Sequence, residues 1–209
     1  MFTGIVQGTA EVVAIEEAEA FRTHVLRLPE ALRHGLEIGA SVAHNGACLT
    51  VTSIDGERVG FDLMRETLRV TNLGDLDVGG RVNIERAARF GDEIGGHAMS
   101  GHVMGMAELV EIEEAPNNRR LWFAPPEQLA RFLFDKGYIG VDGASLTIGE
   151  VRPGTDGSGT CFCVDLIPET LARTVLSERV PGDRVNLEVD PQTQAIVETV
   201  ERVMAERYP

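Results

Sequence analysis

Two glycine turns in this 209-residue chain each lead to a small polar side chain that could do chemistry. Residues 46–50 read Gly-Ala-Cys-Leu-Thr and residues 143–147 read Gly-Ala-Ser-Leu-Thr, so Cys48 and Ser145 occupy equivalent places. A thiol or a hydroxyl becomes a nucleophile or a proton carrier when a base lies beside it, and backbone next to glycine can approach a planar ligand closely. A structural turn followed by core residues is the simpler interpretation, whereas the repeated polar position favours a functional one.

A loop with two histidines lies between these stretches. Residues 95–102 place His97 and His102 among three glycines, and imidazole is well suited to moving protons near neutral pH. The pattern is more typical of a functional loop than of a core segment. The two histidines fit poorly on one helical face, and the chain has no Cys-x-x-Cys pair, so the sequence does not predict a zinc site.

The chain is an internal duplication. Its matched blocks are offset by 97 (Gly4 to Gly101) in the early part of each copy and by 103 (Glu85 to Glu188) in the later part. The offsets agree if the second copy carries a six-residue insertion, which we expect within 153–159. A period of about a hundred residues is typical of duplicated domains, and two like domains predict two like pockets. The matched blocks are 3–11 with 100–108, 45–51 with 142–148, 66–68 with 169–171, and 81–85 with 184–188.

Each copy is expected to consist of short strands. Segments rich in Val, Ile, Thr and Phe alternate with Gly and Asp turns, and 51–59 has the Asp-Gly turn of a β-hairpin. This pattern predicts a small β-barrel or sandwich in each half. Short helices are expected at 29–33, 66–70, 126–132 and 169–173, and strands at 42–54, 59–63, 81–86, 145–151, 161–167 and 184–189.

The tail has no partner in the first half. From Gln192 onward neither glycine nor proline occurs before Pro209, and Ile196, Val200 and Val203 recur at helical spacing. The sequence therefore predicts an amphipathic C-terminal helix. Its apolar stripe would pack either on its own domain or against other subunits.

Composition excludes several functional classes. The formal net charge of −14 argues against a general nucleic-acid binder, which needs a basic face. No apolar run approaches the roughly 18 residues of a membrane span, and the N-terminus lacks a signal-peptide pattern. The number of cysteines is odd, and Cys161 and Cys163 are too close to bridge across an ordinary strand, so we expect a reduced, cytoplasmic setting.

Lys136 is the only lysine among nineteen basic residues. A coding bias toward arginine explains the missing lysines better than it explains this one. A compact ammonium on a flexible stem fits a tight pocket where a guanidinium does not. Lys136 is therefore open to two interpretations, a ligand contact and an ordinary surface residue.

Together these segments resemble riboflavin synthase of the alpha-chain type, a family of lumazine-binding repeats. The resemblance implies an all-β fold of two duplicated six-stranded Greek-key β-barrels with short helices, plus a C-terminal α-helix. The implied parts are two lumazine-binding barrels, 1–96 and 97–190, and a trimerisation helix, 191–209. The stretches that carry the resemblance are 1–6, 41–51, 95–102, 136–137, 143–147, 166–171 and 185–190.

The resemblance also implies an activity. Such enzymes convert two molecules of 6,7-dimethyl-8-ribityllumazine into riboflavin and 5-amino-6-ribitylamino-2,4-pyrimidinedione, with no metal or redox cofactor. The expected partners are this substrate, riboflavin and further copies of the chain in a homotrimer, with no nucleic acid and no membrane. In the family the active site forms between the N-barrel of one subunit and the C-barrel of another. The alternative is a non-catalytic lumazine- or flavin-binding protein like the antenna proteins of luminous bacteria.

The family's functional residues can be carried over position by position. Those implicated in turnover fall on Phe2, Ser41, Cys48, His97, His102, Ser145 and Asp190. The first lumazine pocket would use Gly4, Ile5, Val6, Cys48, Leu49, Thr50, Asp62, Leu63, Met64, Arg65, Glu66, Thr67, Gly101, His102 and Val103. The second would use Lys136, Ser145, Leu146, Thr147, Asp165, Leu166, Ile167, Pro168, Glu169 and Thr170.

Differences between the copies predict where the chemistry lies, because matched positions should build the common pocket. We expect His102 to act in acid–base transfer or to orient a nucleophile. Ser145 and Asp190 would relay protons to a water or hydroxyl, and Cys48 would contact ligand in the other pocket. The differing pairs are Cys48 and Ser145, Ile5 and His102, Ser41 and Tyr138, and Ala87 and Asp190.

Overall fold

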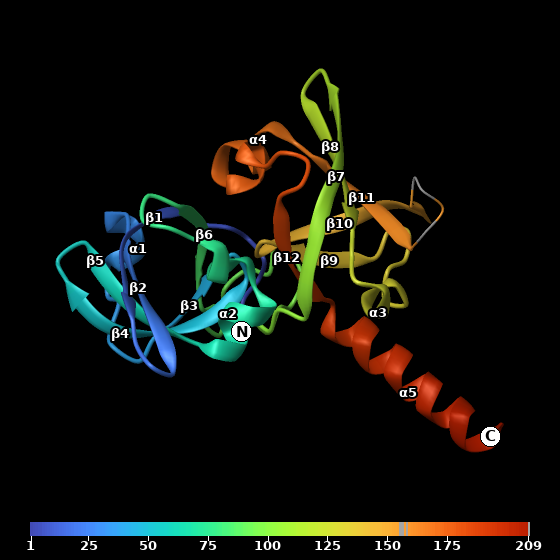
Figure 1. Ribbon diagram of the computed structural model, residues 1–209, viewed down its shortest axis with the longest axis horizontal. Coiled ribbons are helices and arrows are strands. Elements are labelled where there is room, and N and C mark those ends of the chain that lie inside the picture. Colours follow the sequence, from blue (N-terminus) through green and yellow to red (C-terminus); the bar gives the residue numbers. More distant parts are fainter. Residues whose placement is uncertain (155–156, 158, 209) are drawn as a thin grey trace.

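The computed structural model describes residues 1–154, 157 and 159–208. They form two closed, six-stranded antiparallel barrels that lie side by side, and a long helix extends from the second barrel (Figure 1). The first barrel contains β1 (Gly8–Glu17), β2 (Phe21–Arg27), β3 (Ser41–His44), β4 (Ala47–Asp55), β5 (Arg58–Met64) and β6 (Arg81–Arg86). The second contains β7 (Gly105–Ala115), β8 (Asn118–Ala124), β9 (Tyr138–Val141), β10 (Ala144–Pro153), β11 (Thr160–Leu166) and β12 (Arg184–Val189).

Both barrels have the same strand order. Around the first barrel the neighbours are β1-β2-β5-β4-β3-β6, and the second gives the same cycle once each strand is replaced by its duplicate. The predicted all-β fold of two duplicated barrels is therefore confirmed. Each barrel encloses its own apolar core, with Val12 and Phe61 fully buried in the first and Leu109 and Phe162 in the second.

The expected strand at 42–54 is wrong in one respect, since the structure divides it into β3 and β4. Asn45 and Gly46 have φ values of 43° and 83°, so the chain turns there through the left-handed region. Close packing also requires glycine at this turn, because a Cβ on Gly46 would lie 2.9 Å from Gly143 N in the equivalent turn of the other barrel. The two glycine turns thus meet back to back.

The predicted insertion at 153–159 includes residues 155, 156 and 158, which lie outside the described residues. Strand pairing on either side of it agrees with the duplication. Asp55 pairs with Arg58 in the first barrel, and the duplicate of this pair, Arg152 with Cys161, encloses six more residues.

Short helices follow the strands at matched places in the two copies. All four predicted helices are present, although the one expected at 126–132 already ends at Ala130. Each packs a leucine on the core of its own barrel, and two 3-10 helices continue the chain toward β6 and β12. The helices are α1 (Glu30–Arg33), α2 (Arg65–Val70), η1 (Asn72–Asp75), α3 (Glu127–Ala130), α4 (Pro168–Arg173) and η2 (Val175–Glu178).

Amide side chains join the barrels through matched hydrogen bonds. Asn83 Nδ2 donates to Asp142 O (2.8 Å), and its duplicate Asn186 Nδ2 donates to Asn45 O (2.9 Å). All four residues are buried. Because buried amides require satisfied partners, this network fixes how the two barrels are oriented.

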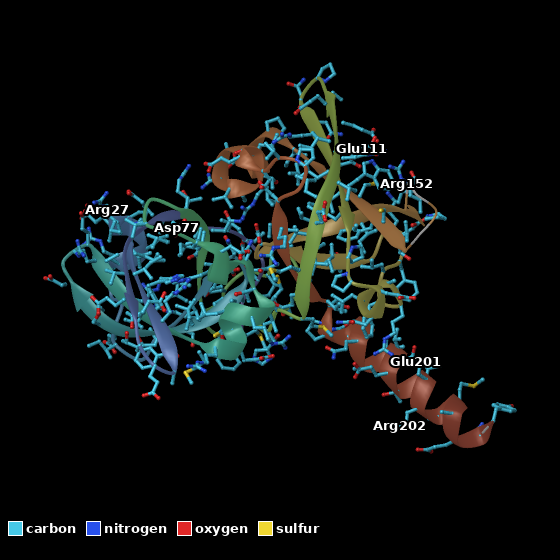
Figure 2. All side chains as sticks on the ribbon, viewed as in Figure 1. Arg27, Asp77, Glu111, Arg152, Glu201 and Arg202 are labelled. Atoms are coloured by element: carbon cyan, nitrogen blue, oxygen red, sulfur yellow. The ribbon has the colours of Figure 1, made fainter. Side chains whose placement is uncertain are left out.

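The C-terminal helix α5 (Pro191–Arg207) leaves the second barrel and stands clear of both barrels beyond its first turns (Figures 1 and 2). Val197 packs at the edge of the second core, and Glu201 forms an ion pair with Arg131. The rest of the stripe is open, with Ile196 64% and Val200 55% exposed. The base of the helix therefore docks on its own barrel, as one of the two alternatives expects. Within the described part of the chain, every helix is too short or too polar to span a membrane.

Candidate active site

The N-terminal segment completes a site on the second barrel. Ser145 N, at the start of β10, donates to Gly4 O over 2.8 Å. Gly4 has φ 73°, and a Cβ there would lie 2.5 Å from the Ser145 Cβ, so this approach needs glycine. The sequence predicts Gly4, Ile5 and Val6 in the Cys48 pocket, whereas in the structure this segment lies against Ser145.

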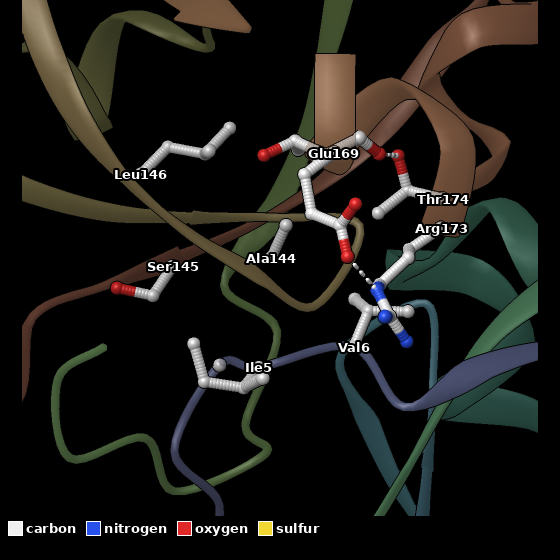
Figure 3. A pocket seen from close by; sticks show the side chains of 10 residues that line it. Ile5, Val6, Ala144, Ser145, Leu146, Glu169, Arg173 and Thr174 are labelled. Carbon is white, nitrogen blue, oxygen red and sulfur yellow. Dashed lines mark hydrogen bonds and ion pairs between the residues drawn. The ribbon is translucent and has the colours of Figure 1, made fainter. Parts of the chain in front are cut away.

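A cavity of about 270 Å³ opens beside Ser145. Ile5 and Val6 form one wall and Leu146 another, while α4 supplies Glu169 and Thr170 (Figure 3). Glu169 is held by an ion pair to Arg173, the residue one turn later on α4. The lining is mainly apolar with a few fixed polar groups, which is the usual character of a small-molecule site.

His97 lies on the Ser145 side chain. Its Nδ1 is 2.7 Å from Ser145 Oγ, and its ring stacks on Tyr138 with centroids 5.2 Å apart. Burial lowers the pKa of His97, while the charge of Asp190 acts in the opposite direction. The imidazole is therefore neutral at pH 7 and its Nδ1 can accept the hydroxyl proton. Within the described residues His97 Nε2 is buried and has no hydrogen-bond partner.

Asp190 has a structural position that the sequence analysis did not anticipate. Its carboxylate caps the N-terminus of α5, accepting hydrogen bonds from Thr193 N (2.9 Å) and Thr193 Oγ1 (2.7 Å). Because the same charge acts on His97, Asp190 connects the start of α5 electrostatically with the Ser145 site.

The Cys48 site is the duplicate of the Ser145 site, with the roles of the two barrels exchanged. Cys48 N donates to Gly101 O over 2.9 Å, the duplicate of the Ser145–Gly4 bond. Phe2 is 1% exposed and packs in one cluster with Met99 and Cys48. This burial makes Phe2 a packing support for Cys48. His102 follows Gly101 and is exposed, and its backbone N–H donates to Ser100 Oγ (3.1 Å).

The remaining predicted residues differ in their contacts and exposure, and Met64, Arg65 and Glu66 border a separate hollow beside Glu19. Asp62 accepts a hydrogen bond from Thr23 Oγ1 (2.6 Å), whereas its duplicate Asp165 pairs with Arg120 at 2.9 Å. The Arg120 hydrogen bond is the main reason that the pKa of Asp165 is lowered, with Lys136 a minor contributor. Leu63, Leu166 and Leu49 are buried, and Val103 and Thr67 are partly buried. The exposed residues are Thr50, Met64, Arg65, Glu66, Lys136, Thr147, Ile167 and Pro168, while Ser41 is partly buried at the start of β3.

Several site residues were missed by the sequence analysis. Tyr138 entered it only as a difference between the copies, and Arg173 and Thr174 follow a matched block without belonging to it. Glu85 and Glu188 end two matched blocks, which was a usable signal. Burial raises the pKa of both glutamates, and hydrogen bonds donated to them oppose that shift.

Known proteins are similar to this chain in sequence and in fold. The lumazine binding domain family matches residues 3–87 and 100–190, so the fold and its two sites define a protein made of two lumazine-binding domains. Riboflavin synthase of Escherichia coli (strain K12) is 62% identical over 208 residues, covering 99% of this chain and 95% of that protein. The chain belongs to the riboflavin synthase family.

A second kind of relative has the same domains. The blue fluorescence protein of Aliivibrio fischeri is 37% identical over 204 residues, covering 90% of this chain and 96% of that protein. The crystal structure of LumP complexed with riboflavin has a TM-score of 0.81 and 28% identity, and covers 90% of this chain and 99% of its own. LumP complexed with 6,7-dimethyl-8-(1'-D-ribityl) lumazine has a TM-score of 0.79 and 27% identity over the same shares.

Proposed function

We propose that this chain catalyses the dismutation of two 6,7-dimethyl-8-ribityllumazine molecules to riboflavin and 5-amino-6-ribitylamino-2,4-pyrimidinedione. The observation that carries the proposal is the contact between His97 and Ser145 at 2.7 Å, in a chain that keeps both lumazine-binding domains. A protein that only held lumazine or a flavin would need the pockets but no proton-transfer pair. The 62% identity to a riboflavin synthase supports the same choice.

The reaction moves a four-carbon unit between two identical molecules, so the protein must treat them differently. One lumazine loses a proton from its 7-methyl group, and the resulting carbanion attacks the other. Holding the two rings in register can lower the barrier by up to about 7–11 kcal/mol. Positioned acid–base groups contribute about 10²–10⁴-fold more.

The two sites supply the required asymmetry. At the second barrel the neutral His97 accepts the Ser145 proton, so the hydroxyl can relay protons to and from a lumazine beside Ile5 and Leu146. At the first barrel Cys48 contacts the other lumazine over the Phe2 packing, with His102 at the opening for a further proton transfer. The surrounding residues, including Thr50, Thr147 and Lys136, hold the two rings and their ribityl chains.

The activity is tested by mixing the purified protein with ribityllumazine, without any added cofactor, and following the visible absorbance of riboflavin. Riboflavin should form with wild-type protein and about 10²–10⁴-fold more slowly with Ser145→Ala, which keeps the cavity but lacks the hydroxyl. Binding of ribityllumazine without any riboflavin would instead support the antenna-type alternative.

We further propose that the chain is a homotrimer joined by 191–209, with each active site between the first barrel of one subunit and the second barrel of another. The exposed stripe on α5 and the open pockets of a single chain support this arrangement. Ile196→Glu with Val200→Glu should give monomers on sedimentation, whereas the control Glu198→Gln should remain a trimer. A trimer that survives the double change would contradict the proposal.

Residues 1–96 and 97–190 are the proposed domain limits. The separate apolar cores of the two barrels support them. A fragment of residues 1–96 should fold and bind riboflavin, as measured by circular dichroism and fluorescence quenching. An unfolded fragment would contradict these limits.

A cytoplasmic location is also proposed. The thiols of Cys48 and Cys163 are not joined in a disulfide, which suits a reducing compartment. Cell fractionation followed by immunodetection tests this location, and a secreted protein would contradict it.

A further inference from the structure

A buried glutamate in the first barrel anchors the N-terminal segment. Glu85, on β6, accepts hydrogen bonds from Thr3 N (2.6 Å) and Thr3 Oγ1 (2.8 Å) through Oε1, and from Gly4 N (3.0 Å) through Oε2. It is 4% exposed. A carboxylate that accepts three such bonds in a dry setting fixes the position of its donors.

The second barrel repeats this anchor at the duplicated position. Glu188, on β12, accepts hydrogen bonds from Ser100 N (2.5 Å) and Ser100 Oγ (2.9 Å) through Oε1, and from Gly101 N (3.1 Å) through Oε2. It is 3% exposed. Both copies have therefore kept a buried acid and the same donor pattern, a costly arrangement unless the acid is fully satisfied.

Each anchored segment then crosses to the opposite barrel. Gly4, held by Glu85 of the first barrel, accepts the Ser145 N–H of the second barrel over 2.8 Å. Gly101, held by Glu188 of the second barrel, accepts the Cys48 N–H of the first barrel over 2.9 Å. A single glycine thus connects each glutamate with the site in the other barrel.

We infer that Glu85 is a positioning residue for the Ser145 site and Glu188 a positioning residue for the Cys48 site, so that each barrel sets the geometry of the other barrel's pocket. The inference deepens the proposed function, on which its kinetic consequence rests. Neither glutamate lines the cavity beside Ser145, and each contacts the other barrel's site through its glycine.

Glutamine is the informative replacement because it keeps the size of the side chain. Its amide presents an acceptor on one side and an NH₂ donor on the other. In Glu85→Gln the NH₂ group would face either Gly4 N–H or the two Thr3 donors, so at least one hydrogen bond is lost and the segment moves. The same reasoning applies to Glu188→Gln, Ser100 and Gly101.

The test uses one reporter for each site, and neither reporter requires turnover. The rate at which iodoacetamide alkylates Cys48, mapped by mass spectrometry in the full-length protein, reports on the first barrel's site. The pH titration of the His97 imidazole by NMR, assigned with His97→Gln, reports on the second barrel's site.

Each glutamine variant is expected to change the reporter of the opposite barrel and not that of its own. Glu188→Gln should change the Cys48 alkylation rate several-fold and leave the His97 titration unchanged, and Glu85→Gln should do the reverse. Reporters that respond only to the glutamate of their own barrel, or to neither glutamate, would overturn the inference.

Weaker variants cover the case in which a glutamine variant fails to fold. Thr3→Val and Ser100→Ala each remove one hydroxyl donor and should give the same crossed pattern at smaller size. Each glutamine change should also lower kcat with ribityllumazine by about 10–100-fold with little change in KM, since a displacement of about 1 Å can cost that much. Crossed reporters in a protein without riboflavin formation would sink the proposed function but leave this inference standing.

Discussion

The two barrels share one topology but differ in the polar groups that they bury. In the first core His24 and His44 are each 1% exposed, and the second core has Leu121 and Val141 at the equivalent positions. Duplication has thus preserved the strand pairing while the buried chemistry diverged. Because strand pairing uses backbone groups, it tolerates such side-chain changes.

The interface between the barrels shows a second difference. Asp142 is fully buried and pairs with Arg179 at 2.7 Å, whereas the first copy has Asn45 and Leu76 at these positions. Burial raises the pKa of Asp142, and the charge of Arg179 opposes that shift. One half of a nearly symmetric interface therefore depends on an ion pair and the other does not.

The catalytic asymmetry should give the largest effect. Ser145→Ala and His97→Ala should each lower kcat by about 10²–10⁴-fold, and the double variant should lose little more because the two residues act as a unit. Cys48→Ser, which installs the residue of the second copy, should cost far less. Single-turnover absorbance kinetics check this, and a larger loss in Cys48→Ser than in Ser145→Ala would reverse the assignment of the sites.

The ion pair offers a comparison in stability. Arg179→Leu should lower the free energy of unfolding by about 3–5 kcal/mol, because it leaves the buried Asp142 carboxylate without its cation. Adding Asp142→Asn gives the second half the residues of the first and should recover most of the loss. Urea unfolding of both variants measures it, and a double variant no more stable than Arg179→Leu would contradict this account.

The histidines should make the first barrel sensitive to acid. Burial lowers the pKa of His24 to about 4 and that of His44 to about 3, while both are near 6.5 when unfolded. The unfolded state therefore binds more protons below pH 6.5, and the native state loses stability as the pH falls from there toward the folded-state values. At pH 5 the loss is roughly 2 kcal/mol for each histidine.

The only tryptophan, Trp122, lies in the second barrel and separates the two signals. At pH 5 circular dichroism should report loss of the first barrel at lower urea than tryptophan fluorescence does, and the gap should narrow at pH 7. His24→Leu with His44→Val, the residues of the second core, should remove this pH dependence. If the difference between the two urea midpoints at pH 5 is unchanged in that variant, His24 and His44 do not cause the acid sensitivity.

Lys136 should give the smallest effect. It has φ 67°, where the first copy has Gly39 at φ 89°. Lys136→Gly should relieve backbone strain of about 1 kcal/mol, partly offset by the greater freedom of an unfolded glycine. Because the proposed function has the ammonium hold lumazine, Lys136→Gly and Lys136→Arg should both weaken binding, which isothermal titration measures. Unchanged affinity in both would make Lys136 an ordinary surface residue.

Much of the fold could be predicted because its signals are local. Each of these signals depends only on residues that are neighbours in the sequence. They are the matched glycine turns, the Asp-Gly hairpin at 51–59 and the apolar stripe of the tail, which predict turns, strands and a helix. The division of 42–54 into β3 and β4 was missed although Asn45-Gly46 is a strong local signal for a hairpin turn.

The sequence by itself determined the duplication, the two barrels, the terminal helix and the residue types of the two sites. Only the tertiary structure decided which residues meet. It placed Gly4 on Ser145 rather than on Cys48, brought His97 to Ser145 across 48 residues of chain, and made Asp190 the cap of α5. The physical reason is that turns and strands are set by neighbouring residues, whereas the crossed contacts depend on how two rigid barrels dock through their buried amides, and no local pattern records that docking.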